Sequence, residues 1–148
     1  MNLLNVLKIS GSALTAQRLR MDVVSSNIAN VETTRTPDGG PYRRQQVVFR
    51  PVAMAVDDTT SRTGNTQPES MAAQGVQVSQ IVANSDKGRV VFDPRHPDAD
   101  ADGFVTYPEI DVLVEMTDML SASRAYEANV TVLNTIKAMA QRTLDIGR

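Results

Sequence analysis

The apolar residues at the two ends of the chain recur at the spacing of α-helices. Residues 3–31 hold one helix breaker, Gly11, and residues 109–146 contain no glycine or proline. The apolar rows with a seven-residue period are Leu7, Leu14, Met21 and Ile28 at the N-terminal end, and Val112, Met119, Tyr126, Leu133 and Ala140 at the C-terminal end. Side chains seven residues apart share one face of a helix, so the pattern predicts a helix at each end, the C-terminal one being longer.

The apolar surface of the C-terminal segment is wider than one partner helix can cover. Further apolar residues lie off the main row: Leu113, Leu120, Val132, Ile136 and Met139. We therefore expect the terminal helices to pair as a coiled coil that neighbouring subunits complete, and to order fully only when those neighbours are present. The alternative is an ordinary two-helix core under a small β cap.

The middle of the chain has a different period and composition. All seven prolines lie between residues 37 and 108, and proline disfavours helix interiors. Runs rich in Val and Ile predict short strands at 42–56, 76–83 and 89–92. We expect these strands to form one small β-rich module anchored by Phe49, Phe92, Phe104 and Tyr42.

These elements predict a fold that is mainly α with a small β-rich insert. A run of Asp, Thr, Ser, Asn and Pro predicts a polar loop at 57–74. The expected parts are an N-terminal helix in 1–34, the β-rich middle module in 35–108, and a C-terminal helix in 109–148.

Composition and charge exclude several classes of function. The formal net charge is −2, so no chain-wide basic field exists to hold a nucleic acid. The absence of cysteine excludes disulfides, thiolate metal sites and cysteine nucleophiles. No apolar run is long enough for a membrane span, and the N-terminus lacks the features of a cleaved signal peptide. We therefore expect a protein that is not membrane-inserted, while export by a dedicated apparatus stays open.

One segment matches the pattern of a twelve-residue calcium loop. Its acidic positions one, three, five and twelve and its glycine are Asp98, Asp100, Asp102, Glu109 and Gly103. Such a loop normally follows a helix, which Pro94 and Pro97 preclude here. A calcium-binding regulatory module through 98–109 is thus the alternative function, and the competing interpretation is an acidic turn leading into the C-terminal helix.

Catalytic and nucleotide chemistry find little support in the sequence. His96 is the sole histidine and stands in a proline-flanked turn without a nucleophile motif, and the glycines match no phosphate loop. We expect no enzyme activity, no cofactor and no small-molecule substrate. The arginines at 35, 43, 44 and 50 could pair with an acidic partner or with phosphates, or they could form a solvated face.

The end of the N-terminal helix carries small and amide side chains at 25–30, which suit close helix approach and hydrogen bonding to freed carbonyls. Spacing alone supports a polar, frayed helix end equally well. Around it, SALTAQRLRMDVVSSNIANVETT at 12–34 resembles the signature shared by bacterial flagellar axial proteins, with Asn27, Ala29 and Asn30 matching its Asn-x-Ala-Asn core. Three further segments resemble the proximal rod proteins of that superfamily: 34–45, 93–108 and 115–130.

This resemblance implies a non-enzymatic subunit of the flagellar rod, the periplasmic drive shaft that transmits motor torque. It implies that the terminal helices form the inner coiled-coil layer and the middle segment an outer module. The implied partners are copies of itself, other rod proteins and the flagellar type III export apparatus, which passes such subunits without cleavage. It also weakens the calcium interpretation, because no metal role attaches to the acidic segment in this family. Glu109, which completes the calcium pattern, departs from the family's usual Asn.

The residues expected to pack between helices and subunits come from both terminal segments. They are Leu7, Leu14, Met21, Asn27, Ile28, Asn30, Met116, Met119, Arg124, Tyr126, Glu127, Asn129, Val130 and Leu133. No catalytic, cofactor-binding or metal-binding residue is expected.

Overall fold

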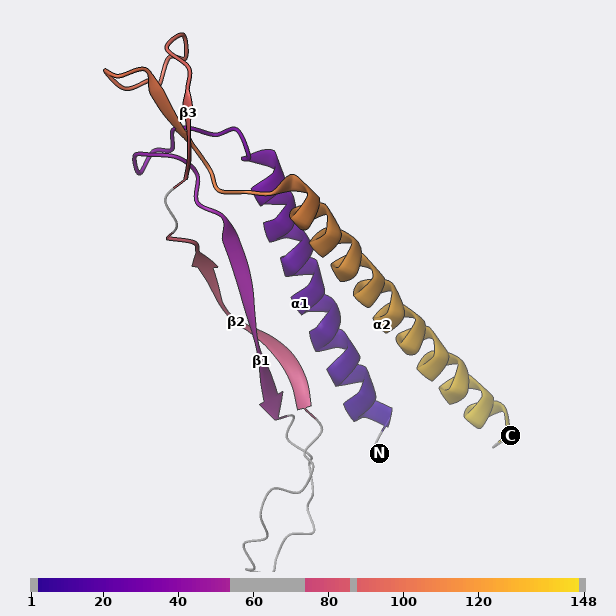
Figure 1. The fold of residues 1–148 in the computed structure, drawn as a ribbon. Coiled ribbons are helices and arrows are strands. Elements are labelled where there is room, and N and C mark those ends of the chain that lie inside the picture. Colours follow the sequence, from indigo (N-terminus) through magenta and orange to yellow (C-terminus); the bar gives the residue numbers. More distant parts are fainter. Residues whose placement is uncertain (1–2, 54–73, 86–87, 147–148) are drawn as a thin grey trace, which may run out of the picture.

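The computed structural model describes residues 3–53, 74–85 and 88–146. Along the chain its elements are α1 (Leu3–Ala29), β1 (Gln45–Ala53), β2 (Gln74–Ala83), β3 (Arg89–Phe92), β4 (Phe104–Tyr107) and α2 (Val112–Ile146) (Figure 1). The predicted polar loop at 57–74 lies, apart from Gln74, outside the described residues.

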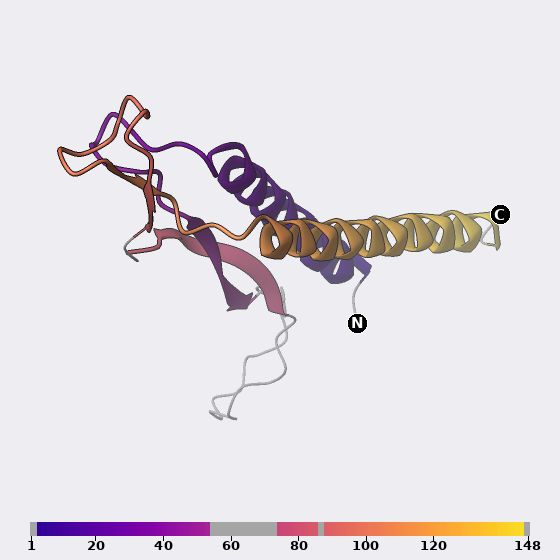
Figure 2. The same ribbon diagram turned by 45° about the horizontal axis from the view of Figure 1, so that its top comes forward.

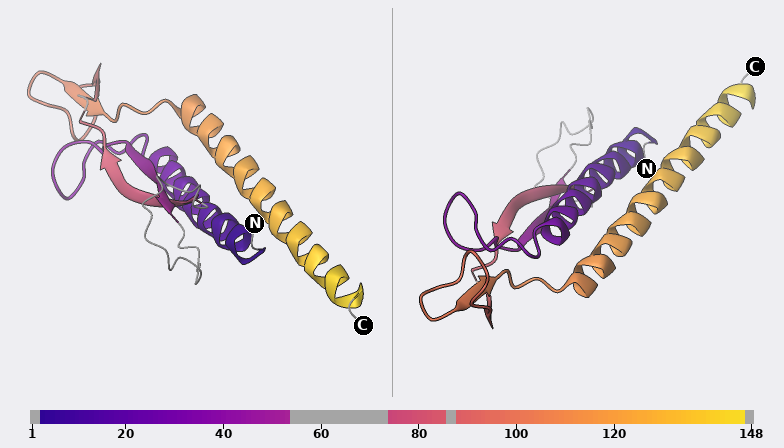
Figure 3. Two further views of the ribbon diagram at one scale, coloured as in Figure 1. Left: turned by 90° about the horizontal axis from the view of Figure 1, so that it is seen from below. Right: turned by 90° about the horizontal axis from the view of Figure 1, so that it is seen from above.

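The two helices run antiparallel along the length of the molecule, with α1 between α2 and the β1–β2 strands (Figures 1 and 3). They contain 27 and 35 residues, which corresponds to about 40 and 52 Å. The C-terminal turns of α2 extend beyond the start of α1 (Figure 2). The predicted pair of long terminal helices is confirmed; their completion by neighbouring subunits stays a prediction.

Local hydrogen bonds determine where the helices begin and end. Asp111 Oδ1 accepts the backbone N–H of Leu113 at 2.9 Å, so Asp111 caps α2, which starts three residues later than the sequence pattern predicts. At the end of α1, the N–H of Asn30 donates to the carbonyl oxygens of Ser26 and Asn27, at 3.1 and 3.2 Å. These hydrogen bonds complete the last turn of α1, after which the chain leaves the helix and continues to β1.

Strands β1 and β2 form an antiparallel hairpin that packs along α1. A bulge between Val48 and Phe49 shifts its register. One face is directed towards α1, where Ser12 Oγ accepts the backbone N–H of Val76 at 3.1 Å. Gly75 is buried on the same strand. The helix therefore supplies the surface on which the hairpin is folded.

Strands β3 and β4 form a second, separate antiparallel sheet. Within the described part of the chain these strands contact no helix and no other strand. The expectation of one module anchored by four aromatics is therefore wrong, because Phe49 belongs to the hairpin and Tyr42 hydrogen-bonds to α1, while only Phe92 and Phe104 pair with each other. The strand β4 itself was not predicted from the sequence.

The buried core is thin and almost free of large side chains. Among the described residues, the buried apolar ones are Ala16, Val23, Val24, Val105, Ala122 and Ile136. Small residues let helices approach closely, but they remove little apolar area from water. The described part of the chain thus covers the helix pair only in part.

Candidate functional site: a buried polar junction and an exposed helix face

A polar junction joins the end of α1, the start of β1 and the start of α2. At its centre Asn27 is completely buried. Its Nδ2 donates to Gln45 O at 2.8 Å and to Glu115 Oε2 at 3.0 Å. Its Oδ1 accepts the Gln45 N–H at 2.9 Å and the Tyr42 hydroxyl at 3.1 Å. Both donor hydrogens and both acceptor positions are used, so this amide fixes three segments at once.

The junction also holds a buried carboxylate. Glu115 is 0% exposed, and its Oε1 accepts a hydrogen bond from Arg44 Nε at 2.6 Å. Arg44 also lies 3.8 Å from Asp118, which pairs with Arg20 on α1 at 2.9 Å. A buried charge is tolerated when a counter-charge and hydrogen bonds satisfy it. Removing one partner of such a pair costs about 3–5 kcal/mol.

The expectation of hydrogen bonds to freed helix carbonyls is confirmed at Asn30. Its Nδ2 donates to the Ser26 carbonyl at 2.9 Å, and its Oδ1 accepts the Thr33 hydroxyl at 3.1 Å. The two asparagines of the signature therefore act differently: Asn30 closes the helix end, and Asn27 connects α1 to the rest of the fold. Sequence spacing indicated the first role and missed the second.

Apart from Asn27, which is completely buried in the junction, the predicted packing residues lie around the most buried part of the helix interface. The seam with the greatest burial runs through Ala16 and Val23 on α1 and Ala122 and Ile136 on α2. The partly buried predicted residues are Leu7, Leu14, Met21 and Ile28 on α1, and Met119, Tyr126, Asn129, Val130 and Leu133 on α2. Each keeps surface that a neighbouring helix can cover.

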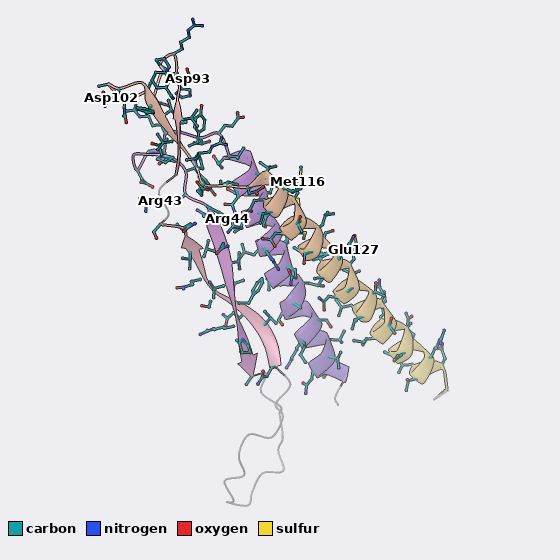
Figure 4. The ribbon with its side chains drawn as sticks, viewed as in Figure 1. Arg43, Arg44, Asp93, Asp102, Met116 and Glu127 are labelled. Atoms are coloured by element: carbon teal, nitrogen blue, oxygen red, sulfur yellow. The ribbon has the colours of Figure 1, made fainter. Side chains whose placement is uncertain are left out.

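A second surface of α2 is turned away from α1. Leu113, Met116 and Leu120 are 73%, 52% and 60% exposed, and Arg124 and Glu127 are exposed further along the helix. Their spacing of three or four residues aligns them in one stripe, which we call the outer stripe. Met116 and Glu127 are labelled on α2 in Figure 4. The outer stripe combines apolar area with charged groups that define a register.

The structure does not assemble the calcium pattern into a calcium loop. Asp98 accepts a hydrogen bond from the Thr34 hydroxyl at 2.8 Å and lies 3.6 Å from Arg35. Residues Phe104–Tyr107 are extended as β4, which carries the following Glu109 away from the turn. Among the described residues, no group of three His, Asp or Glu side chains is placed to hold a metal ion. The calcium alternative therefore has no structural support.

His96, the other candidate for chemistry, has a local structural contact. Its Nδ1 accepts the backbone N–H of Asp98 at 3.1 Å, and its ring packs edge-on against Tyr107 with centroids 6.1 Å apart. These contacts shape the turn before β4.

No described helix is long and apolar enough to cross a membrane.

Two flagellar families match the ends of the chain, where the helices lie. "Flagella basal body rod protein" matches residues 7–35, which include Asn27 and Asn30. "Flagellar basal body rod FlgEFG protein C-terminal" matches residues 101–146, which include Glu115 and all of α2. The class of protein is thus that of flagellar basal-body rod proteins.

Relatives named "Flagellar basal-body rod protein FlgC" match the whole chain. The relative from Borreliella burgdorferi is 44% identical over 99% of this chain and 98% of its own length. Those from Escherichia coli and Bacillus subtilis are each 43% identical, covering 100% and 96% of both chains respectively. The chain therefore belongs to the FlgC family of flagellar basal-body rod proteins.

Proposed function

We propose that this chain is a structural subunit of the flagellar basal-body rod, assembling with copies of itself and other rod proteins into a shaft that crosses the periplasm and transmits torque. In this proposal, 1–34 and 109–148 form the inner coiled-coil layer and 35–108 the outer module. The flagellar type III apparatus exports the subunit uncleaved. Family membership supports the rod assignment.

The observation that carries the packing mechanism is the outer stripe of α2. A helix that is apolar on two sides requires neighbours on both. One side of α2 faces α1, whereas Leu113, Met116 and Leu120 remain more than half exposed. Neighbouring helices that cover this stripe would gain about 25 cal/mol for each Å² of apolar surface buried.

The polar junction supports the stiffness that torque transmission needs. It fixes the first turn of α2 to α1 and β1 through directional hydrogen bonds, whose geometry resists sliding of one element past another. The outer stripe begins at the same end of α2. Neighbours would therefore dock on the part of the helix whose position the chain itself defines best.

The test compares two single variants in a strain that lacks the natural protein. Leu120→Gln places an amide in the outer stripe, whereas Ser121→Gln places the same amide at an adjacent exposed position. We expect Leu120→Gln to reduce both the amount of the chain in purified basal bodies and motility, with secretion unchanged. Ser121→Gln should behave as wild type. Equal incorporation of both variants would contradict the packing mechanism.

Export is tested separately. The chain should leave the cytoplasm when the flagellar type III apparatus is intact and accumulate inside the cell when that apparatus is deleted. A chain that stays inside in both strains would contradict the proposed route and favour a cytoplasmic adaptor.

A further inference from the structure

Helix α1 has one side that the described part of the chain leaves exposed. The exposed residues follow one another along α1 at intervals of three, four or seven, so they share one side of the helix. Gly11 lies on the same side, and no other part of the described chain comes within 4 Å of where its Cβ would be. These exposed residues, which we call the free face of α1, are Leu4, Lys8, Thr15, Arg18, Asp22, Ser25 and Ala29.

Four charged side chains on the free face and the outer stripe have no counter-charge in the described part of the chain: Arg18 and Asp22 on α1, and Arg124 and Glu127 on α2. Each helix carries its two charges three or four residues apart, a spacing at which an ion pair can form along one helix. The structure nevertheless pairs neither helix's charges with each other. A second molecule can therefore supply their counter-charges.

The order of these charges selects one direction of pairing. Along each helix the basic residue comes first and the acidic residue second. Parallel helices would therefore bring like charges together, whereas antiparallel helices bring Arg18 opposite Glu127. Asp22 then lies within one residue of the level of Arg124, a shift of about 1.5 Å that a long arginine side chain spans.

The same alignment brings large apolar residues of α2 against small residues of α1. Leu120 lies opposite Ser25, and Met116 lies opposite Ala29. Leu120 and Met116 are 60% and 52% exposed in the single chain. Large and small residues at facing positions interdigitate well, so the apolar residues and the charges favour one register.

Other charges on the two helices lie outside this line of contact. Arg142 and Asp145 stand at or beyond the level of the first residue of α1. Lys8 reaches the level of Lys137, but Lys137 is ten residues from Glu127 and therefore about 80° further round α2. The two facing stripes thus contain no directly opposed like charges.

We propose that the free face of α1 in one copy docks on the outer stripe of α2 in a second copy, antiparallel and with Arg18 paired to Glu127. Within one chain α1 and α2 are already antiparallel (Figures 1 and 3), so copies that point the same way present these faces in the required direction. Ion pairs along a helix interface set its partner and its register, while the apolar residues supply the buried area.

This contact is heterologous, because different faces of the two copies meet. Each copy keeps one face of each kind for a further neighbour, so the contact repeats until a rotation closes a ring or an open helical assembly forms. The inference rests on the proposed rod function and names the occupant of the outer stripe.

Cysteine cross-linking tests the contact, because the chain contains no cysteine of its own. Thr15 and Thr131 are exposed, and the register places them within one residue of the same level. A chain carrying Thr15→Cys and Thr131→Cys is expressed in place of the natural protein, and purified basal bodies are mildly oxidised. We expect a ladder of disulfide-linked oligomers, because each copy presents a cysteine to each of two neighbours.

The matched control keeps Thr15→Cys and places the second cysteine on the same helix, as Ser25→Cys. The charges of α1 would also fit a second α1 in a copy that points the opposite way, and that pairing would bring Thr15 opposite Ser25. The control chain should give no disulfide between copies. Dimers of the control chain would overturn the proposed contact in favour of this reversed pairing.

The reduced sample separates failure of the contact from failure of the proposed function. If the Thr15→Cys/Thr131→Cys chain is present in basal bodies but gives no ladder, the contact is overturned and the rod function stands. If wild-type chain is absent from basal bodies, both are overturned.

Charge reversal provides a second test. Glu127→Arg opposes Arg18 with a like charge and should lower incorporation into basal bodies at least about fivefold. Adding Arg18→Glu to the same chain should restore incorporation to within about twofold of wild type, whereas adding Lys8→Glu, the same kind of change at a different level of α1, should not. Restoration by both second changes, or by neither, would overturn the register.

Discussion

Replacing Asn27 with alanine should destabilise the fold far more than its size implies. The change removes the four hydrogen bonds of the junction. It leaves one oxygen of buried Glu115 without its amide donor, and it leaves the N–H and C=O groups of Gln45 without partners. The hydroxyl of Tyr42 keeps its contact with Ser26 at 3.3 Å.

The magnitude follows from the groups that lose partners. A buried polar group left unsatisfied costs about 1–3 kcal/mol, and Gln45 is only partly buried, so water can reach it. We expect Asn27→Ala to lower the free energy of unfolding by about 3 kcal/mol. For a chain of this length that corresponds to a melting temperature lower by roughly 6–12 °C.

The matched control is Asn30→Ala. It removes hydrogen bonds at a helix end that solvent can reach, and should cost about 1 kcal/mol or less. Urea unfolding of both purified variants, followed by far-ultraviolet circular dichroism, gives the two free energies. Equal and small losses for Asn27→Ala and Asn30→Ala would refute the argument that the junction is what holds α1, β1 and α2 together.

Four further outcomes follow from particular contacts. Gln17→Leu should raise the free energy of unfolding by about 1 kcal/mol in urea unfolding, since Gln17 Oε1 is buried without a hydrogen-bond partner among the described residues; a loss of stability would contradict this. Gly88→Ala should cost about 1–3 kcal/mol in the same assay, because a Cβ would overlap the carbonyl oxygen of Tyr107; an unchanged midpoint would contradict it. Calorimetry with millimolar calcium should give no heat for the wild type or for Asp100→Ala. In hydrogen exchange of the monomer, the backbone amides in the first turns of α2, beside Glu115, should exchange more slowly than those in its last turns. Uniform protection along α2 would contradict the expectation that the junction makes the start of this helix its most stable part.

The helices could be predicted because their signals are local. The confinement of proline to residues 37–108 leaves both ends free to be helical, and the seven-residue apolar rows specify the faces. The C-terminal helix begins at residue 112 and not at the predicted residue 109, because a single side chain, Asp111, caps its first turn. Boundaries set by one hydrogen bond are poorly determined by periodicity.

The arrangement of the strands and the junction depends on contacts distant in sequence. Arg44 and Glu115 are 71 residues apart, and although an acidic partner was one interpretation of the arginines at 35–50, nothing in the sequence identified Glu115 as that partner. Asn27 could be recognised as part of a helix-end motif, but its bonds to β1 and α2 require the tertiary fold. The strand β4 was not predicted because its four residues lie within the segment 98–109 that matches the calcium pattern, and a run of four residues is too short for its periodicity to indicate a strand.

The role of the outer-stripe residues in subunit contacts stays a prediction. Met116, Arg124 and Glu127 were expected to contact other subunits, and all three are exposed in the single chain. Because these residues are exposed, a neighbouring subunit can reach them, but such a neighbour is present only in an assembled rod. Their role is therefore decided by variants tested in the assembly.

The most direct test of the central claim is the composition of purified basal bodies, with and without this chain. Quantitative mass spectrometry of basal bodies from the wild type should detect the chain together with the other rod proteins, and deletion of its gene should abolish motility and leave the rod incomplete. Intact rods that lack the chain, in cells that still swim, would contradict its assignment as a structural subunit of the rod.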